Sequence, residues 1–402
     1  MDGKMKSQSI HHHAFRLLPV ILSILFLLLF AGLLSAQEVT ITVMNPSPSD
    51  RTLETVEVPW SQISNYLPLS GQSSVEVTEK NKEVFSQLID LDGNGIPDQL
   101  VFQSSFRKGE EKFFVVRVGP EKPEIKSVTN AKYILPRKDV AWENDRIAYR
   151  IYGGPLAGTV FNGLDVWTKR VRYQIIDKWY DGDSLKGKKR ISYHVDHGEG
   201  ADMFDVVYSL GAGACAPWIN GKIDQPGLFT TYKIIATGPV RAMFTVWYEK
   251  DTSRGLPFKE EATYTLDAGM NLNRIEVTYT GLTPEQPLAI AAGLVKRKNT
   301  TQYADEKKSW LSLWGHINED STNGSLGIGI VIPGSSFKEL NEDKDQYLII
   351  ANAESGKPYT YYAGAGWTRS GDFGSVDDWN GYLSQCAQNI RYPLKVTIGT
   401  AK

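Results

Sequence analysis

Hydrophobic residues along most of this chain alternate with polar ones in short runs, and turn-forming residues separate the runs. Val39 to Val43, Arg146 to Tyr152 and Val240 to Tyr248 are examples, each rich in β-branched or aromatic residues. A period of two, bounded by Gly, Pro, Asn or Asp, is typical of β-strands joined by turns. No alternation of strands with helices occurs, which argues against a parallel doubly wound sheet. The pattern predicts a mainly β protein: a large antiparallel β-sandwich, super-sandwich-like, with a few short helices.

Two segments have a helical period instead. Apolar residues recur every three or four positions from Leu164 to Trp179 and again from Trp379 to Ile390. This spacing places them along one face of a helix. The first segment ends near Asp181-Gly182, and Pro393 follows the second, as is typical of helix ends. We therefore predict one helix in each segment.

The N-terminal region has the pattern of a secretory leader. Basic residues precede an apolar run from Leu17 to Leu34, and Leu34-Ser35-Ala36 fits a cleavage site. We expect residues 1–36 to be a signal peptide, residues 37–132 to form an N-terminal β region packed on the main sandwich, and residues 133–402 to form the main β-sandwich. The apolar run is also long enough for an uncleaved membrane anchor, so that alternative stays open. With cleavage, we expect a periplasmic or secreted protein without stable membrane insertion.

Charge and cysteine content narrow the function further. The formal net charge is −2, so the chain has no overall electrostatic preference for nucleic acid, and we expect no nucleic-acid partner. Cys215 and Cys386 are the only cysteines. An oxidising compartment permits a disulfide between them, whereas two free thiols are the other interpretation. The sequence does not decide between these alternatives.

One acidic segment has the composition of a cation-binding loop. Asp90, Asp92, Asn94 and Asp98 place oxygen atoms at alternating positions, with glycines between them. This resembles the start of a calcium loop, although the distal glutamate of an EF-hand is missing. A hairpin turn rich in Asp, Asn and Gly needs no metal. We predict no cofactor for activity, and a structural role for calcium if it binds here.

Histidine is rare, and its distribution gives the best functional clue. Outside the leader only His194, His197 and His316 remain, and the first two share one short segment. Imidazole suits proton transfer near neutral pH, so we predict catalytic roles for all three. On a regular strand His194 and His197 point to opposite faces, and they converge only if the strand ends near the following glycines. Zinc ligation with Asp196 and purely structural hydrogen bonding are the alternatives, and no H-E-x-x-H pattern supports zinc.

Arginines and a glycine-rich segment supply further candidates. Arg146 and Arg150 share strand parity with Ala148 between them, so their guanidinium groups could hold one carboxylate. Ion pairing with nearby acids is the commoner explanation of such arginines. The segment from Tyr361 to Phe373 combines glycines with aromatic and charged residues, which suits ligand contact or closure of one end of a sandwich.

Three motifs carry a family resemblance. They are Trp142–Arg150, Tyr193–Gly200 with Leu210–Gly213, and Gly364–Trp367 with Asp378-Trp379. At these residues the chain resembles a family of secreted bacterial proteins described as a domain of unknown function. The resemblance implies a link to the breakdown of uronic-acid polysaccharides, and the family is identified as including an oligosaccharide dehydratase that acts on ulvan fragments.

The resemblance and the residue types together predict an eliminase that acts on an acidic oligosaccharide. Dehydration of a terminal uronic acid removes the C5 proton and expels the C4 hydroxyl, which requires a base, an acid and stabilisation of the carboxylate. The predicted catalytic residues are His194, His197, His316, Arg146 and Arg150. The predicted substrate-binding residues are Tyr193, Tyr362, Trp367, Arg369 and Asp372. A polysaccharide lyase, a glycoside hydrolase and a non-catalytic sugar-binding protein remain alternatives.

Overall fold

The computed structural model describes residues 38–67, 69, 73–120, 127–250, 256–282 and 288–399. The expected signal peptide and the apolar run within it lie outside these residues. In the described part of the chain, no helix is long and apolar enough to span a membrane. The predicted fold class is confirmed, because antiparallel strands build five sheets and only two α-helices occur in the described ranges.

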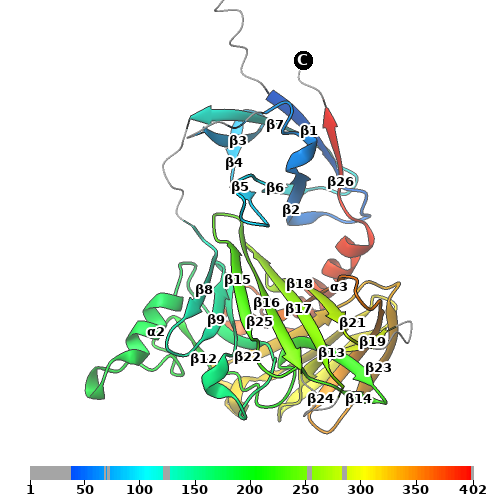
Figure 1. Cartoon of the computed structure of the whole chain (residues 1–402). Helices are drawn as coiled ribbons and strands as arrows, with labels where there is room; N and C mark the ends of the chain where they lie inside the picture. Colours follow the sequence, from blue (N-terminus) through cyan, green and yellow to red (C-terminus); the bar gives the residue numbers. More distant parts are fainter. Residues whose placement is uncertain are drawn as a thin grey trace, which may run out of the picture.

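An N-terminal module of two small sheets forms the upper part of the molecule in Figure 1. Its five-stranded sheet has the order β26-β1-β7-β3-β4, and its three-stranded sheet the order β2-β6-β5. Apolar residues of both sheets, among them Ile41, Val56 and Phe102, form a core of their own. The strands are β1 (Glu38–Met44), β2 (Arg51–Pro59), β3 (Ser73–Glu79), β4 (Lys82–Val84), β5 (Ser86–Ile89), β6 (Gln99–Phe106), β7 (Glu111–Pro120) and β26 (Lys395–Gly399).

The remaining strands form the main body. An eight-stranded sheet has the order β15-β16-β17-β18-β25-β22-β21-β20, and a five-stranded sheet the order β14-β13-β19-β24-β23. The largest apolar cluster of the molecule joins these two sheets. Their strands are β13 (Ala212–Ile219), β14 (Lys222–Ile223), β15 (Thr231–Ala236), β16 (Arg241–Lys250), β17 (Phe258–Asp267), β18 (Leu272–Thr280), β19 (Leu288–Val295), β20 (Thr300–Asp305), β21 (Trp310–His316), β22 (Ser325–Val331), β23 (Phe337–Glu342), β24 (Gln346–Ala353) and β25 (Tyr359–Trp367).

A further five-stranded sheet, β12-β11-β10-β9-β8, forms a middle layer that is buried on both faces. Trp142 on its inner face packs on Phe244 and Tyr264 of the eight-stranded sheet, with ring centroids 4.7 and 5.2 Å away. Its outer face packs on Trp179 and Tyr193. The strands are β8 (Asn130–Ile134), β9 (Asp139–Glu143), β10 (Ile147–Ile151), β11 (Asp165–Lys169) and β12 (Gly200–Asp202).

The helix predicted near the C-terminus is confirmed as α3 (Val376–Arg391). Ser375 caps it, since its hydroxyl accepts a hydrogen bond from the Asp378 N–H at 3.2 Å. Trp379 packs directly over Gly327 and Gly366, where a Cβ atom would come within 2.7 Å of the Trp379 ring. Glycines on β22 and β25 therefore let α3 lie close against the sheet.

The helix predicted over Leu164–Trp179 is wrong for its first half. Residues Asp165–Lys169 form strand β11, and the helix, α2 (Ile176–Ser184), begins only after them. Val166 faces the main apolar cluster and Trp167 faces the outer one, so apolar residues occupy both sides of the strand. A strand buried on both faces has no alternation that distinguishes it from a helix segment.

The connections contain single-turn 3-10 helices, and both cysteines are free thiols. Cys215 lies in β13 within the main core, whereas Cys386 lies on α3, so the disulfide alternative is not present. The 3-10 helices are η1 (Trp60–Gln62), η2 (Gly154–Leu156), η3 (Gly187–Lys189), η5 (Ile317–Glu319), η6 (Ser321–Asn323) and η7 (Thr368–Ser370).

Candidate functional site

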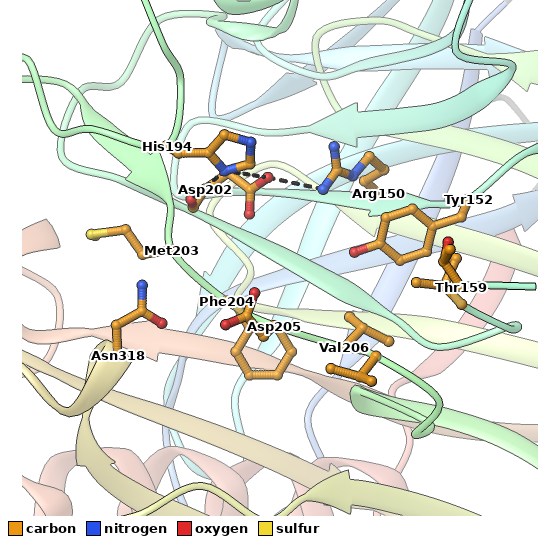
Figure 2. A pocket seen from close by; sticks show the side chains of 12 residues that line it. Arg150, Tyr152, Thr159, His194, Asp202, Met203, Phe204, Asp205, Val206 and Asn318 are labelled. Carbon is orange, nitrogen blue, oxygen red and sulfur yellow. Dashed lines mark hydrogen bonds and ion pairs between the residues drawn. The ribbon is translucent and has the colours of Figure 1, made fainter. Parts of the chain in front are cut away.

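A pocket of about 330 Å³ lies where β10 and β12 of the middle layer end. We call it the His194 pocket. Figure 2 shows His194, Asp202 and Arg150 in a row along one side, with Asn318 and Phe204 across the opening. The lining residues are Arg150, Tyr152, Thr159, Val160, His194, Asp202, Met203, Phe204, Asp205, Val206, Val207 and Asn318.

His194 presents a proton-transfer group to this pocket. Its side chain is 54% exposed, and its Nδ1 atom lies 3.1 Å from the backbone carbonyl oxygen of Asp202 and 3.4 Å from the Asp202 carboxylate. Because a carbonyl oxygen only accepts hydrogen bonds, this contact favours a proton on Nδ1. In that tautomer the Nε2 atom carries a lone pair and can accept a proton from a ligand.

Asp202 is the buried partner of His194. Burial raises the pKa of its carboxyl group well above the usual range, and the nearby Asp165 carboxylate acts in the same direction, whereas Arg150 opposes the rise. A raised pKa favours the protonated form of a carboxyl group, and this form can donate a proton as well as a hydrogen bond. The pocket therefore combines a potential base and a potential acid on adjacent residues.

Arg150 fixes this pair from behind. Asp165 faces Arg150 across the β10–β11 pairing, and the closest contact of their charged groups is 2.7 Å. The same guanidinium donates to Asp202 at 2.9 Å and lies over the rings of Tyr152 and Trp167, at 4.8 and 5.2 Å from their centroids. Arg150 is only 5% exposed. Its charge is balanced by the Asp165 carboxylate, and its main role in the geometry is to hold Asp202 in place.

The layer behind Arg150 is held together by a second buried ion pair. Lys169 Nζ lies 2.5 Å from Glu143, and both side chains are fully buried. The Glu143 carboxylate also accepts the N–H groups of Ile175 and Ile176, at 2.9 and 3.0 Å, where α2 begins. An acid at a helix N-terminus satisfies N–H groups that have no partner within the helix. α2 and the Trp167 side of the pocket are therefore anchored to the same strands.

Two residues that line the pocket have an unusual backbone conformation. Val207 has a φ of 52° and Asn318 a φ of 50°. Asparagine tolerates this left-handed region, whereas a β-branched residue such as valine rarely adopts it. Such a conformation persists only where surrounding structure enforces it, and it is concentrated at functional sites.

Two of the ten residues predicted from the sequence, His194 and Arg150, line this pocket, and Tyr193 contacts both without lining it. Tyr193 is buried, with its ring 4.9 Å from Trp167 and its hydroxyl 3.3 Å from Arg150 Nη1. Residues 190–199 contain no strand, so the parity argument for His194 and His197 does not apply. His197 is exposed and lies outside the lining of the pocket.

His316 is also outside the pocket lining. It ends β21, where its Nδ1 atom lies 3.5 Å from the Ser325 hydroxyl. Asn318, two residues later, is the one that lines the pocket. Of the three predicted histidines, only His194 therefore lines this pocket.

The other predicted residues form contacts elsewhere. Arg146 pairs with Asp372, which also accepts two hydrogen bonds from Arg172 at 2.9 and 3.0 Å. Arg369 stacks on Trp367 and lies 3.5 Å from Asp196. Trp367 is buried, and its Nε1–H donates to the Asn323 carbonyl at 2.7 Å. These contacts match the ion-pair and closing-loop interpretations.

A second and larger cavity of about 660 Å³ is lined by residues of the N-terminal module, α3 and the eight-stranded sheet. We call it the α3 groove. Arg146 and Tyr362 line it, together with Arg51, Arg241 and Arg274. Each of these last three arginines is paired with a carboxylate of β2 or β17.

Sequence reasoning missed most of the groups around His194. Asp165, Asp202 and Tyr152 were not singled out, and neither was Asp205 at the pocket rim. Asp202 lies only eight residues after His194, so the short separation was an available signal. The pairing of Asp165 with Arg150 depends on the register of β10 and β11 and has no local signature.

The predicted calcium loop has converging carboxylates. Oxygen atoms of Asp90, Asp92 and Asp98 lie within 4.8 Å of one another. Asp90 accepts the N–H groups of Gly93, Asn94 and Gly95, and these hydrogen bonds lower the pKa of its carboxyl group. This is the geometry of a turn stabilised by its own acidic residue. Calcium at this loop stays a prediction.

Comparisons with known proteins identify the family. The model of the family described as "Domain of unknown function (DUF4861)" matches residues 43–396. "Uncharacterized protein P7" of Formosa agariphila is 30% identical over 378 residues, which cover 89% of this chain and 93% of that protein. The chain belongs to the DUF4861 family.

Two solved structures are similar to this chain over 90% of its length. A protein in the glycosyl hydrolase family 38 from Enterococcus faecalis is similar with a TM-score of 0.50 and 12% identity, over 90% of this chain and 48% of that one. An α-mannosidase from Enterococcus faecalis V583 has a TM-score of 0.49 and 11% identity, over 90% of this chain and 46% of its own. The chain spans about half the length of these two structures. At 12% identity the similarity to the first of these structures concerns the fold alone.

Proposed function

We propose that this DUF4861 protein is a carbohydrate-active enzyme that dehydrates a terminal uronic acid of an oligosaccharide in the His194 pocket. The observation that carries the proposal is the exposed imidazole of His194, oriented by a buried Asp202 carboxyl group with a raised pKa. General acid–base chemistry needs two such groups within reach of one ligand. The pocket volume of about 330 Å³ is in the range of small-ligand sites.

In this proposal His194 Nε2 takes the proton from C5 of the sugar. The electron pair of the C5–H bond forms the C4=C5 double bond, and the C4–O bond breaks. The hydroxyl group takes a proton from Asp202 and leaves as water. His194 then releases its proton to solvent and Asp202 takes one proton back from solvent, which restores both groups. Arg150 stabilises the charge that Asp202 carries after donating its proton.

The fold and the family resemblance support a carbohydrate substrate. The similar fold of a glycosyl hydrolase family 38 protein is consistent with carbohydrate-related function. The resemblance to a family that includes an ulvan-oligosaccharide dehydratase favours a uronic acid and, among its sources, ulvan fragments. We place the activity in the periplasm or outside the cell, because residues 1–36 have the pattern of a leader.

A glycoside hydrolase is the second candidate, and one observation favours it. Asp202 and Asp205 both line the His194 pocket. Hydrolysis of a glycosidic bond usually requires two carboxyl groups, one protonated and one ionised. The raised pKa of Asp202 suits the acid, and the exposed Asp205 suits the base or nucleophile.

One experiment separates the candidates. The purified protein is incubated with ulvan-derived and glucuronan-derived oligosaccharides, and ultraviolet absorbance and product masses are recorded. We expect a new absorbance of a conjugated enoate together with the loss of one water and no shortening of the chain. Absorbance with chain cleavage identifies a lyase, and cleavage without absorbance identifies a hydrolase. Either result, or no reaction, contradicts the proposed dehydration.

A further inference from the structure

Two aromatic residues follow directly on the segments that line the His194 pocket. The segment from Asp202 to Val207 contributes one side of the lining, and Tyr208 comes next. Thr159 and Val160 also line the pocket, and Phe161 follows them. The rings of Phe161 and Tyr208 meet edge to face, with centroids 5.4 Å apart. The contact therefore joins the two segments that line the pocket.

Tyr208 remains accessible although its orientation is fixed. Tyr208 is 50% exposed, and its hydroxyl donates to the Gly158 carbonyl at 2.5 Å. The following Ser209 is buried, and its hydroxyl donates to the Val206 carbonyl at 2.6 Å. The phenol oxygen is thus bonded to the protein, while half of the residue remains exposed to solvent. A rigid ring loses little conformational entropy when a ligand packs on it.

The backbone next to Tyr208 supports a functional reason for this arrangement. Val207 holds a φ of 52°, although its side chain is 55% exposed and gains little from burial. This conformation turns the chain between the pocket lining and Tyr208. Strain of this kind, with no compensating burial of the strained side chain, is typical of segments that position a ligand-binding group.

We propose that Phe161 and Tyr208 form a second sugar-binding subsite, which holds the sugar residue adjacent to the one in the His194 pocket. This inference rests on the proposed function, because it assigns the pocket itself to a terminal sugar. The flat apolar face of Tyr208 matches the C–H face of a pyranose ring, and the exposed Asp205 carboxylate can accept hydrogen bonds from sugar hydroxyls. The occupant is a sugar residue of an oligosaccharide at least two residues long.

The test compares binding across chain length. Isothermal titration calorimetry measures the affinity of wild type, Tyr208→Ala and Tyr208→Phe for glucuronate and for oligoglucuronates of two to five residues. Cello-oligosaccharides of equal length serve as neutral probes. Tyr66→Ala is the matched control, since Tyr66 is 40% exposed but lies in the N-terminal module.

We expect Tyr208→Ala to weaken binding of the disaccharide and longer oligoglucuronates by about 3- to 10-fold, with no change for glucuronate alone. Tyr208→Phe keeps the ring and should bind within about twofold of wild type, as should Tyr66→Ala. Equal affinity of wild type and Tyr208→Ala at every length overturns the inference. An equal loss for glucuronate and for longer chains also overturns it, because the residue then only supports the pocket.

The same measurements separate this inference from the proposed function. If wild type binds either series with a length-dependent loss in Tyr208→Ala but forms no enoate, the subsite is supported and dehydration is not. If enoate forms and Tyr208→Ala binds every length like wild type, dehydration stands and the subsite is rejected. If wild type binds neither series, the subsite is rejected together with the assignment of the pocket to a sugar.

Discussion

Arg150 lies on β10, whereas Arg146 lies in the turn directly before that strand, so the predicted shared strand parity is wrong and the two arginines line different cavities. Arg150 lies in the His194 pocket, and Arg146 lines the α3 groove. The groove has about twice the volume of the pocket and contains more charged side chains. The pocket, in contrast, has a half-exposed imidazole next to a carboxyl group with a raised pKa. The comparison shows that neither size nor the number of charges identifies a site of chemistry.

The charges of the α3 groove pair with one another. Arg241 contacts Asp267 at 2.6 Å and Glu57 at 2.6 Å, and Arg274 contacts Glu57 at 3.0 Å. Arg51 contacts Glu54 at 2.9 Å. Because Glu57 belongs to β2 and Arg241 to β16, these pairs join the N-terminal module to the main body. The groove therefore has the properties of an internal interface.

The largest difference between the His194 pocket and the α3 groove is expected when the His194 imidazole is removed. His194→Ala should lower turnover about 10²–10⁴-fold, because general acid–base catalysis is lost, while the melting temperature stays near that of wild type. His197→Ala is the matched control, since His197 is exposed and outside the pocket. Steady-state kinetics and differential scanning fluorimetry measure the two effects. Turnover of His194→Ala at the wild-type rate contradicts the assignment of the site.

Substitutions in the α3 groove should lower stability and leave turnover nearly unchanged. Arg241→Met leaves Asp267 and part of Glu57 without their partner, so we expect the free energy of unfolding to fall by about 3 kcal/mol. Turnover at temperatures where the variant is folded should change little. Arg274→Met removes a more exposed pair and should cost less than about 1 kcal/mol. Urea denaturation compares the two variants, and a selective loss of turnover in Arg241→Met would give the groove a catalytic role.

Glu260, a buried acid on β17 outside the His194 pocket, makes the free energy of unfolding depend on pH. Burial raises the pKa of Glu260 from 4.5 to about 8. Its Oε2 atom and the hydroxyls of Tyr248 and Tyr279 have no hydrogen-bond partner within the described residues. Between these pH values the folded state binds more protons than the unfolded state, so the free energy of unfolding falls as pH rises from about 4.5 to about 8.

Glu260→Gln should remove this dependence, which amounts to at most about 1.4 kcal/mol per pH unit. The variant is then more stable than wild type at pH 8, and the pH profile of its turnover can be assigned to the pocket without interference from unfolding. Glu261→Gln is the neighbouring exposed control. Melting temperatures from pH 5 to pH 8 provide the measurement. Parallel curves for wild type and Glu260→Gln are the result that contradicts the buried-acid explanation.

The smallest effect concerns the thiols. Cys215 and Cys386 are free, and Cys386 lines the α3 groove. A reducing agent should therefore leave the melting temperature unchanged, and alkylation of the unfolded, unreduced protein should label both cysteines. Labelling of neither cysteine before reduction contradicts the structure.

The sequence predicted the fold class and α3 because both depend on local periodicity. Alternating burial along β17 illustrates the first, and the inward face of Trp379 and Leu383 the second. β11 was misassigned because both of its faces are apolar. For a strand in the middle of three layers, the neighbours that determine its conformation lie far away in the sequence.

The site was predicted less well, and the reason is electrostatic pairing. His194 was found because histidine is rare, and Arg150 because of its position on a strand. The sequence does not show which charges neutralise each other, since Arg146 pairs with Asp372 across 226 positions and Arg150 with Asp165 through strand register. Residue type therefore identified the candidates. Only the fold showed that Arg146 and Arg150 are ion-paired, whereas the His194 imidazole is half-exposed at the pocket.

The position of β26 decides how the upper part of the molecule can be isolated. This strand, formed by residues 395–399, pairs with β1 and completes the edge of the sheet to which β1 belongs. A fragment that stops at Pro120 leaves the hydrogen-bonding groups along one side of β1 open to any other extended peptide. A recombinant version of the module should therefore append residues 395–399 through a short linker, which restores the native edge and limits self-association.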